Sequence, residues 1–400
     1  MKAGTLKLLI PVVAVTVQNN SANMIIPPFL QHLQIPVVTI GTLISLNPIA
    51  ALVSRIPMGI VYREHRARLF IAFGVIAMGI TNFLYSFASD SLTFAVVHLL
   101  NGFAYGAVTT LYMAFYVDSL PAGENRNHAM GYYVGTLALG YSTGNFLGGG
   151  IADWFGYAAT FRVAAFLSLV PVALLWLLRG KGGSRGVKAQ GKVASKMTWR
   201  GALKAILDPG LATVIAVALF LNLVHQASGV FITLYGLGVG LTLTQVGVLR
   251  AAYAGCNAIT RPISGHVVDR LGHRWISYVG FPVQCALMMF IPLFTGFGSI
   301  LAVYISAGVL RAVVIVANAV GLVQDVDEAR VRRGVASGIY NAAGDLGNVL
   351  GPTIGGLIAA ATSVSGVFIV APVASTILFL FSMWGIRAAQ NRSPVSSTSS

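Results

Sequence analysis

Charged residues are scarce in this chain of 400 residues: they make up 9% of it, against 56% apolar residues. A water-soluble protein carries about a quarter charged residues, so this composition excludes an ordinary soluble domain. Cysteine is scarcer still, and Cys256 and Cys285 lie in apolar runs without metal-ligand spacing. This excludes a disulfide framework and a zinc site, and the two cysteines are expected to be core residues. The chain is therefore predicted to be a membrane protein.

Motifs of catalysis and of cofactor binding are also missing. The sequence has no glycine-rich phosphate loop ending in Lys and Ser or Thr, and no His-Glu-x-x-His zinc motif. It has no nucleophile elbow in a strand-to-helix context. We therefore expect neither an enzyme nor a cofactor or metal.

What the sequence has in abundance is apolar runs of about 20 residues, the length that crosses roughly 30 Å of hydrocarbon. Each run is expected to be a helix, because a spanning segment must satisfy its own backbone hydrogen bonds. No signal-peptide cleavage pattern opens the chain, so the first run is expected to stay as a span. The runs predict twelve transmembrane helices, at 8–31, 38–63, 68–89, 92–118, 125–150, 156–178, 210–238, 243–268, 275–295, 299–325, 333–360 and 366–387.

The basic residues, which give a net charge of +15, gather in the connections of one side. Nucleic-acid binding would need them on a water-facing patch, and no such partner is expected. Clustered Lys and Arg remain in the cytoplasm, so both termini are predicted to be cytoplasmic, in the inner membrane of a bacterium. The glycine- and lysine-rich segment 179–209 divides six runs from six. We predict an N-terminal six-helix bundle at 1–178, a basic cytoplasmic linker at 179–209, a C-terminal six-helix bundle at 210–390 and a disordered tail at 391–400. An anionic-lipid patch is the alternative interpretation of the linker.

The two halves repeat each other. A shift of 207 positions aligns GYYVGTLALGYSTGNFLGGG (131–150) with GIYNAAGDLGNVLGPTIGGL (338–357), and a shift of 206 aligns Arg55 with Arg261. Glycines spaced by three or four residues on one helix face let membrane helices approach closely. Duplicated halves with a site at their interface are typical of transporters.

The segment after the eighth run resembles the loop signature of the major facilitator superfamily, and the resemblance extends over essentially the whole chain. The signature residues are Gly265, Asp269, Arg270 and Arg274, with Gly272 between them. Arg270 and Arg274 can compensate Asp269 at a helix C-terminus and latch to a neighbouring bundle. The equivalent segment 59–68 lacks the Asp and the second Gly. The resemblance implies two pseudo-symmetric six-helix bundles that form an all-α membrane protein.

The eleventh run carries Gly351, Pro352 and Gly355, which resemble a motif of the family's drug:proton antiporters. The fifth run, where that motif is expected, has Asn145 in place of the Pro. In the fourth run His98 stands where those antiporters have an Arg, which replaces a fixed charge by a titratable imidazole. The resemblance to the antiporter branch thus implies efflux, with these departures.

Amides interrupt the first run at membrane mid-depth, in the stretch VQNNSANM. Amides facing lipid would be costly, so they are expected to face a watery cavity, with matching residues of the seventh run. The residues are Gln18, Asn19, Asn20 and Asn23 in the first run and Asn222, His225 and Gln226 in the seventh. The alternative is hydrogen bonding that only holds helices together, at about 0.6 kcal/mol per bond.

Charges inside spans are expensive and therefore indicate function. Arg311 and Asp345 lie at the midpoints of the tenth and eleventh runs. They are interpreted either as a structural ion pair or as a site where Asp345 alternates between a proton and a cation. Arg250 could contact an anionic solute or shield the outer mouth. Arg162 is expected to pair with Asp153, while Arg55 and Arg261 are expected to bind helix ends or loops.

These features together predict a monomeric secondary transporter whose partners are a small molecule, protons and the lipid bilayer. The first hypothesis is proton-coupled export by alternating access, with Asp345, His98 and His225 as titrating residues. Uptake or facilitated passage of an organic anion is the alternative, and a non-transporting receptor or assembly factor on the same fold is a second. The predicted substrate contacts are Gln18, Asn19, Asn20, Asn23, Tyr112, Asn222, Gln226, Arg311 and Asn341.

Overall fold

The computed structural model describes residues 7–121, 126–177, 209–328 and 333–392, which are helical nearly throughout and contain no strand. The predicted linker lies outside these ranges except for Pro209, and so does the predicted tail except for Asn391 and Arg392. The helices of the N-terminal half (N-half) are α2 (Ile10–His32), α3 (Val37–Val61), α4 (Glu64–Tyr85), α5 (Ser91–Asp118), α6 (Arg126–Leu167) and α7 (Leu169–Leu177). Those of the C-terminal half (C-half) are α9 (Pro209–Gly238), α10 (Leu243–Leu271), α11 (His273–Trp275), η1 (Ile276–Gly280), α12 (Phe281–Met289), η2 (Ile291–Leu293), α13 (Phe297–Glu328), α14 (Arg333–Ala361) and α15 (Val367–Arg392).

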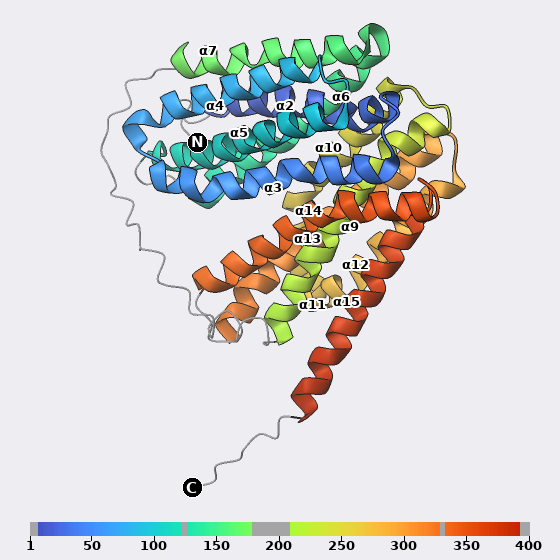
Figure 1. Ribbon diagram of the computed structural model, residues 1–400. Coiled ribbons are helices and arrows are strands. Elements are labelled where there is room, and N and C mark those ends of the chain that lie inside the picture. Colours follow the sequence, from blue (N-terminus) through green and yellow to red (C-terminus); the bar gives the residue numbers. More distant parts are fainter. Residues whose placement is uncertain (1–6, 122–125, 178–208, 329–332, 393–400) are drawn as a thin grey trace.

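Helix α6 covers two of the predicted spans. Its backbone breaks at Gly156, which adopts φ 80° and ψ 173°. Glycine is suited to this conformation because it has no Cβ to clash at positive φ. The chain turns there, and the second arm of α6 runs back toward α7 (Figure 1).

Eight helical segments of the described chain are long and apolar enough to cross a membrane. Helices α2, α10 and α14 are not among these eight. One of the eight, the segment 128–177, contains both arms of α6 and therefore two predicted spans. The helices left out carry many of the polar residues that the sequence marks: the amides of α2, Arg250 and Arg261 of α10, and Asp345 of α14. The count of twelve spans and the cytoplasmic location of the termini stay predictions.

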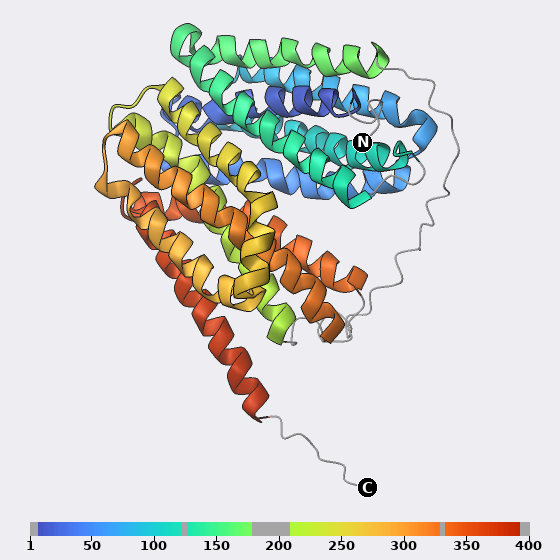
Figure 2. The same cartoon turned by 180° about the vertical axis from the view of Figure 1, so that it is seen from behind.

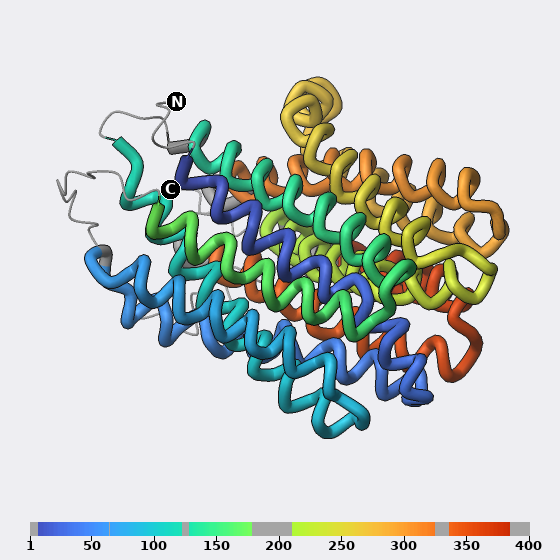
Figure 3. The backbone as a smooth tube through the Cα atoms, turned by 90° about the horizontal axis from the view of Figure 1, so that it is seen from above, coloured from blue at the N-terminus to red at the C-terminus, as the bar shows by residue number. Residues whose placement is uncertain are grey.

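The two halves lie against each other as separate bundles. One side of the molecule, which we call the linker side, holds the end of α7 and the start of α9. The C-terminal ends of α3, α5, α10 and α13 lie on the same side. The turns at 33–36, 86–90, Gly156 and 239–242 lie on the opposite side, which we call the far side. The ribbons of the two bundles meet toward the far side and diverge toward the linker side (Figures 1 and 2). Viewed at right angles, the helices run along the same general direction between these two sides (Figure 3).

Equivalent glycines fix the packing inside each half. A Cβ at Gly140, Gly144 or Gly148 of α6 would meet the α2 residues Thr16, Val17 or Ser21. A shift of 207 leads to Gly347, Gly351 and Gly355 of α14, where a Cβ would meet α9 at Leu219, Leu223 or Phe231. The prediction that the repeated glycines permit close helix approach is confirmed, and the approach places α2 and α9 at equivalent positions in the two bundles.

Candidate functional site

Two seams join the halves on the far side. The first is formed by α3 and α14, where a Cβ on Gly41 would collide with the Pro352 carbonyl and approach Gly356. The Ser45 hydroxyl donates to the Val349 carbonyl at 2.6 Å and accepts from the Thr353 hydroxyl at 2.8 Å. Backbones this close leave no room for a solute between them.

The second seam is formed by α6 and α10. A Cβ on Gly149 would collide with the Leu243 carbonyl, and one on Gly247 would lie 2.7 Å from the Asn145 carbonyl. Gly149 and Gly356 are related by the shift of 207, and Gly41 and Gly247 by that of 206. The repeat thus builds both seams, and together they close the far side.

Asp153 adds a charged contact to the second seam. Its carboxylate accepts hydrogen bonds from the backbone N–H groups of Leu243 and Thr244, each at 3.2 Å, and from the Thr244 hydroxyl at 2.7 Å. It therefore caps α10 from the other half of the molecule, where the helix dipole favours a negative charge. Partial burial opposes ionisation, but the hydrogen bonds from Thr244 and its neighbours outweigh it and lower the pKa of Asp153. The predicted Asp153–Arg162 pair is wrong, and the Arg162 guanidinium lies over the Phe87 ring at 5.9 Å.

Between the seams and the linker side lies a cavity of about 530 Å³, within the range of small-molecule sites. Both halves line it, as predicted for a site at the interface of the bundles. Its polar lining consists of Asn19, Asn20, Asn23, Asn47, Arg55, His98, Tyr105, Tyr141, Asn145, Asn222, His225, Gln226, Arg250, Tyr253, Asn257, Arg261, Tyr304, Arg311, Asp345 and Asn348. A smaller cavity of about 240 Å³ shares Arg55, Asn222, Asp345 and Asn348 with it and adds Tyr340 and Asn341.

Three arginines form the C-half wall of the central cavity. Arg311 of α13 is buried and donates to the Leu221 carbonyl at 2.8 Å and to Asn222 Oδ1 at 2.9 Å. Arg261 donates to Asn257 Oδ1 at 3.1 Å, and Arg250 makes a long contact of 3.4 Å to Thr233. Within the described ranges none of the three guanidiniums has a carboxylate within ion-pair distance.

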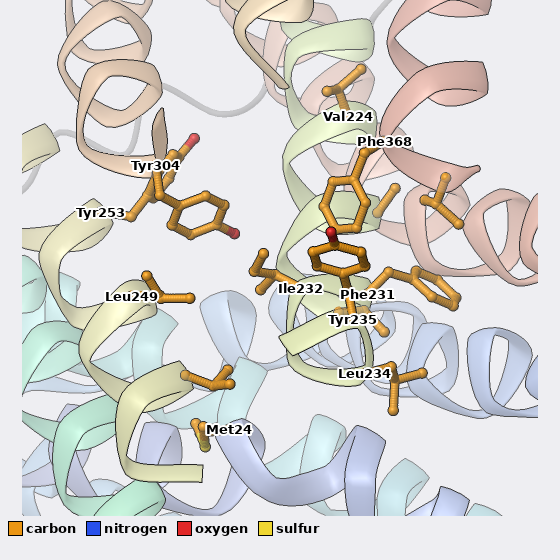
Figure 4. Close-up of a cluster of buried hydrophobic side chains, with 14 of the residues drawn as sticks. Met24, Val224, Phe231, Ile232, Leu234, Tyr235, Leu249, Tyr253, Tyr304 and Phe368 are labelled. Carbon is orange, nitrogen blue, oxygen red and sulfur yellow. The ribbon is translucent and has the colours of Figure 1, made fainter. Parts of the chain in front are cut away.

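Aromatic rings lie next to these arginines. His225 stacks on Tyr253 with ring centroids 5.3 Å apart and planes at 13°, and Tyr253 contacts Tyr304 at 4.9 Å. Figure 4 shows Tyr253 and Tyr304 side by side, in the buried cluster that also contains Phe231 and Phe368. His225 therefore lines the cavity as one member of an aromatic stack.

Asp345 pairs with Arg55. The Arg55 guanidinium lies 2.7 Å from Asp345 Oδ2, and the two side chains are 41% and 22% exposed. This corrects two expectations. The sequence predicts that Asp345 lies beside Arg311, and that Arg55 binds a helix end or a loop. The pair joins α3 to α14 on the linker side of the contact between Ser45 and Val349.

Three of the four predicted amides of α2 line the cavity, and the fourth does not. Asn19, Asn20 and Asn23 face the cavity. Gln18 is fully buried away from it, and neither polar atom of its side chain has a hydrogen-bond partner within the described residues. Gln18 does not line the cavity, because successive residues of a helix point about 100° apart, and its contact with substrate stays a prediction.

Tyr112 is the other predicted contact that lies elsewhere. It is buried, and its hydroxyl donates to the Leu8 carbonyl at 3.1 Å. Asn341 belongs to the smaller cavity, while Asn222 and Gln226 line the central one. His98 lines the central cavity at one edge, and its Nδ1 lies 2.6 Å from the Tyr85 hydroxyl.

The predicted structural residues fall into two groups. Gly351, Pro352 and Gly355 lie where α14 packs on α9 or α3. Gly265 has open space around it, and Asp269, Arg270 and Arg274 are exposed at the linker side. Their action as a latch stays a prediction.

Several cavity residues were not predicted as substrate contacts, among them Asn47, Tyr105, Tyr141, Asn257 and Asn348. A single polar residue in an apolar run has no periodic signal that tells its direction. Only the alignment of Arg55 with Arg261 could have indicated that both arginines face the same space.

Comparisons with known proteins agree with this architecture. The family model described as Major Facilitator Superfamily matches residues 8–331. The uncharacterized MFS-type transporter MJ1560 of Methanocaldococcus jannaschii is 22% identical over 80% of this chain and 82% of its own. The membrane sensor protein UhpC of Escherichia coli is 29% identical over 43% of this chain and 39% of its own.

Solved structures show the same fold at low identity. A bacterial homolog of the human lysosomal transporter Spinster, inward-facing and unoccupied, gives a TM-score of 0.74 at 13% identity, over 96% of this chain and 95% of that one. The nucleoside transporter NupG gives 0.74 at 13% identity, over 98% and 100%. The chain therefore belongs to the Major Facilitator Superfamily, and its family and fold are those of a multi-pass membrane transporter and not of an enzyme.

Proposed function

We propose that this protein is a secondary transporter that carries a small organic anion by alternating access. The charge of the central cavity supports the proposal: four arginines line it together with one acid, and that acid is already paired with Arg55. A buried charge without a partner is costly. An anionic solute would compensate Arg250, Arg261 and Arg311, so it would be bound where a neutral or cationic solute would not.

The two seams supply the conformational part of the proposal. Both halves touch on the far side through glycines, and the bundles diverge on the linker side. Rigid rocking of one bundle against the other would open the seams and close the opposite side. If the linker is cytoplasmic, as predicted, this state is inward-facing, which is also the state in which the Spinster homolog was solved.

Proton-coupled export of a small organic molecule is the second candidate, and it was the first hypothesis from the sequence. The observation in its favour is that Asp345 is the single carboxylate among the lining residues. In this scheme Asp345 exchanges Arg55 for a proton, and His98 and His225 assist.

A sensing function is a further candidate, and one comparison bears on it. The similarity to a membrane sensor protein covers less than half of either chain, so it supports a shared segment and not a shared activity. A sensor would bind its ligand in the central cavity without net flux.

Uptake into proteoliposomes separates these candidates. Labelled organic anions, neutral molecules and organic cations would be compared with and without an imposed pH gradient. We expect anion flux that Arg311→Gln abolishes and that Arg162→Gln, outside the cavity, leaves intact. Efflux driven by the pH gradient and lost in Asp345→Asn would favour export, and saturable binding without flux would favour sensing.

A further inference from the structure

The two walls of the central cavity differ in the chemistry that they offer. The C-half contributes Arg250, Arg261 and Arg311. The N-half contributes the carboxamides of Asn19, Asn20 and Asn23, together with Arg55, whose charge Asp345 already neutralises. One wall is therefore cationic, and the facing wall is polar without net charge.

The carboxamides of α2 are largely free to bind a solute. Asn20 donates to the Thr16 carbonyl at 2.9 Å. Asn19 and Asn23 make no side-chain hydrogen bond to any described residue, although both face the cavity and Asn19 is only 6% exposed. Each amide offers two donors and an acceptor with two lone pairs.

On the opposite wall, two polar residues of the equivalent helix α9 are committed to other groups, while Gln226 also lines the cavity without a side-chain hydrogen bond to a described residue. Asn222, one turn from Gln226, accepts from Arg311 and donates to the Ala218 carbonyl. His225 is stacked on Tyr253. The repeat therefore provides two polar helices: α9 supports an arginine through Asn222, whereas α2 presents two uncommitted carboxamides to the facing wall.

We infer that the substrate is an organic anion with an uncharged, hydroxyl-rich second part, its anionic group on the C-half arginines and its hydroxyls on Asn19 and Asn23. This inference rests on the proposed function and names the substrate class of the same site. The anionic group is a carboxylate or a phosphate, since both match the arginine donors.

Other second parts fit the N-half wall less well. A cationic end would need a carboxylate, and Asp345 is already bound to Arg55. A purely aliphatic end would cover the amides and remove their hydrogen bonds to water without replacing them, which is costly. Hydroxyls can both donate to and accept from carboxamides, so they satisfy this wall without a change in charge.

The inference is tested with matched six-carbon probes and the purified full-length protein. Gluconate, hexanoate, 6-aminohexanoate and sorbitol vary the hydroxyls and the charge one at a time. Sorbitol 6-phosphate and hexyl phosphate repeat the comparison with phosphate as the anion. Binding is measured by isothermal titration calorimetry, and flux by uptake of the labelled probe into proteoliposomes.

We expect a hydroxylated anion to bind at least about tenfold more tightly than its aliphatic partner, a difference of roughly 1.4 kcal/mol. Asn19→Leu and Asn23→Leu should remove this preference while anion binding persists. Gln18→Leu is the matched control, because it changes an amide of the same helix that does not face the cavity. Circular dichroism of each variant checks that the helices remain folded.

The outcomes separate the inference from the proposed function. Equal binding of hydroxylated and aliphatic anions, or a preference for 6-aminohexanoate, would overturn the inference and leave an anion carrier. A preference that survives in both Asn variants would overturn it too. Binding of sorbitol alone, or of none of the six probes, would overturn both.

Discussion

The α3–α14 seam and the α6–α10 seam are built from equivalent glycines but place their charges differently. In the first seam, Arg55 and Asp345 form an ion pair that faces the cavity. In the second, Arg261 takes the place of Arg55, but the shift of 207 leads from Asp345 to Ala138. The acid of the second seam, Asp153, lies on the far side at the start of α10. The repeat thus gives both seams the same glycine contacts, while the cavity-facing charges are balanced in the first seam and cationic in the second.

The largest effect is expected from a methyl group placed in either seam. In Gly41→Ala and Gly149→Ala the new Cβ would meet a carbonyl oxygen of the opposite half, which cannot move as a side chain can. Overpacking of this kind costs about 1–3 kcal/mol, so the closed far side should lose roughly fivefold or more in population. The population of the closed state is measured by the accessibility, from the far side, of a cysteine introduced in the far half of the cavity. Gly131→Ala, which has open space, is the control. Unchanged accessibility in both seam variants would show that the glycine contacts do not set the closed state.

A second prediction makes the two seams alike. Ala138→Asp places a carboxylate at the position equivalent to Asp345, in the cavity wall shared with Arg261. The new acid should compensate Arg261 and compete with an anionic substrate, so anion affinity should fall by about tenfold, or roughly 1.4 kcal/mol. Ala138→Asn is the isosteric control without charge. Equal affinity in the two variants would mean that Arg261 does not hold the anion.

A third prediction concerns the ion pair of the first seam. Both partners are partly exposed, so the pair is expected to contribute up to about 1 kcal/mol to the present state. Arg55→Gln and Asp345→Asn should each shift the conformational equilibrium by up to roughly fivefold, read by double electron–electron resonance across the linker side. The double variant Arg55→Asp, Asp345→Arg should restore the equilibrium if the ion pair itself holds α3 and α14 together. If neither single variant shifts the conformational equilibrium, the ion pair does not stabilise the present state.

The smallest effect is expected at Asp153. Its hydrogen bonds to Thr244 and Leu243 lower its pKa, so its stabilisation of the closed seam is present above the ordinary pKa of Asp and is lost as pH falls through the lowered value. Far-side cysteine accessibility should therefore be constant near neutral pH and rise only in acid. Asp153→Asn should weaken the cap by up to about 1 kcal/mol and remove the rise. Asp90→Asn is the control, since Asp90 caps α5 within the N-half. If cysteine accessibility still rises in acid in Asp153→Asn, a group other than Asp153 causes the pH dependence.

The sequence was informative wherever a property repeats along a helix. Apolar runs predicted the helices, and the shift of 207 predicted that the repeated glycines let helices approach closely, while the partners, α2 for α6 and α9 for α14, came from the structure. Arg311 and the amides of α2 were recognised because a polar group in an apolar run is conspicuous. Gln18 and Tyr112 were misplaced for the same reason, since an unusual residue does not reveal which way its helix is turned.

The amino-acid sequence by itself determined that this is a helical membrane protein of two related halves, because hydrophobic length and repeated glycines are local properties that survive in any arrangement of the chain. Only the tertiary structure decided that Asp345 binds Arg55 and not Arg311, that Asp153 caps a helix of the other half, and that three arginines share a cavity without an acid of their own. The first two of these contacts join residues 290 and 90 positions apart in the chain. All of them depend on the rotation and tilt of each helix. Tertiary packing sets both, so they cannot be read from local sequence patterns.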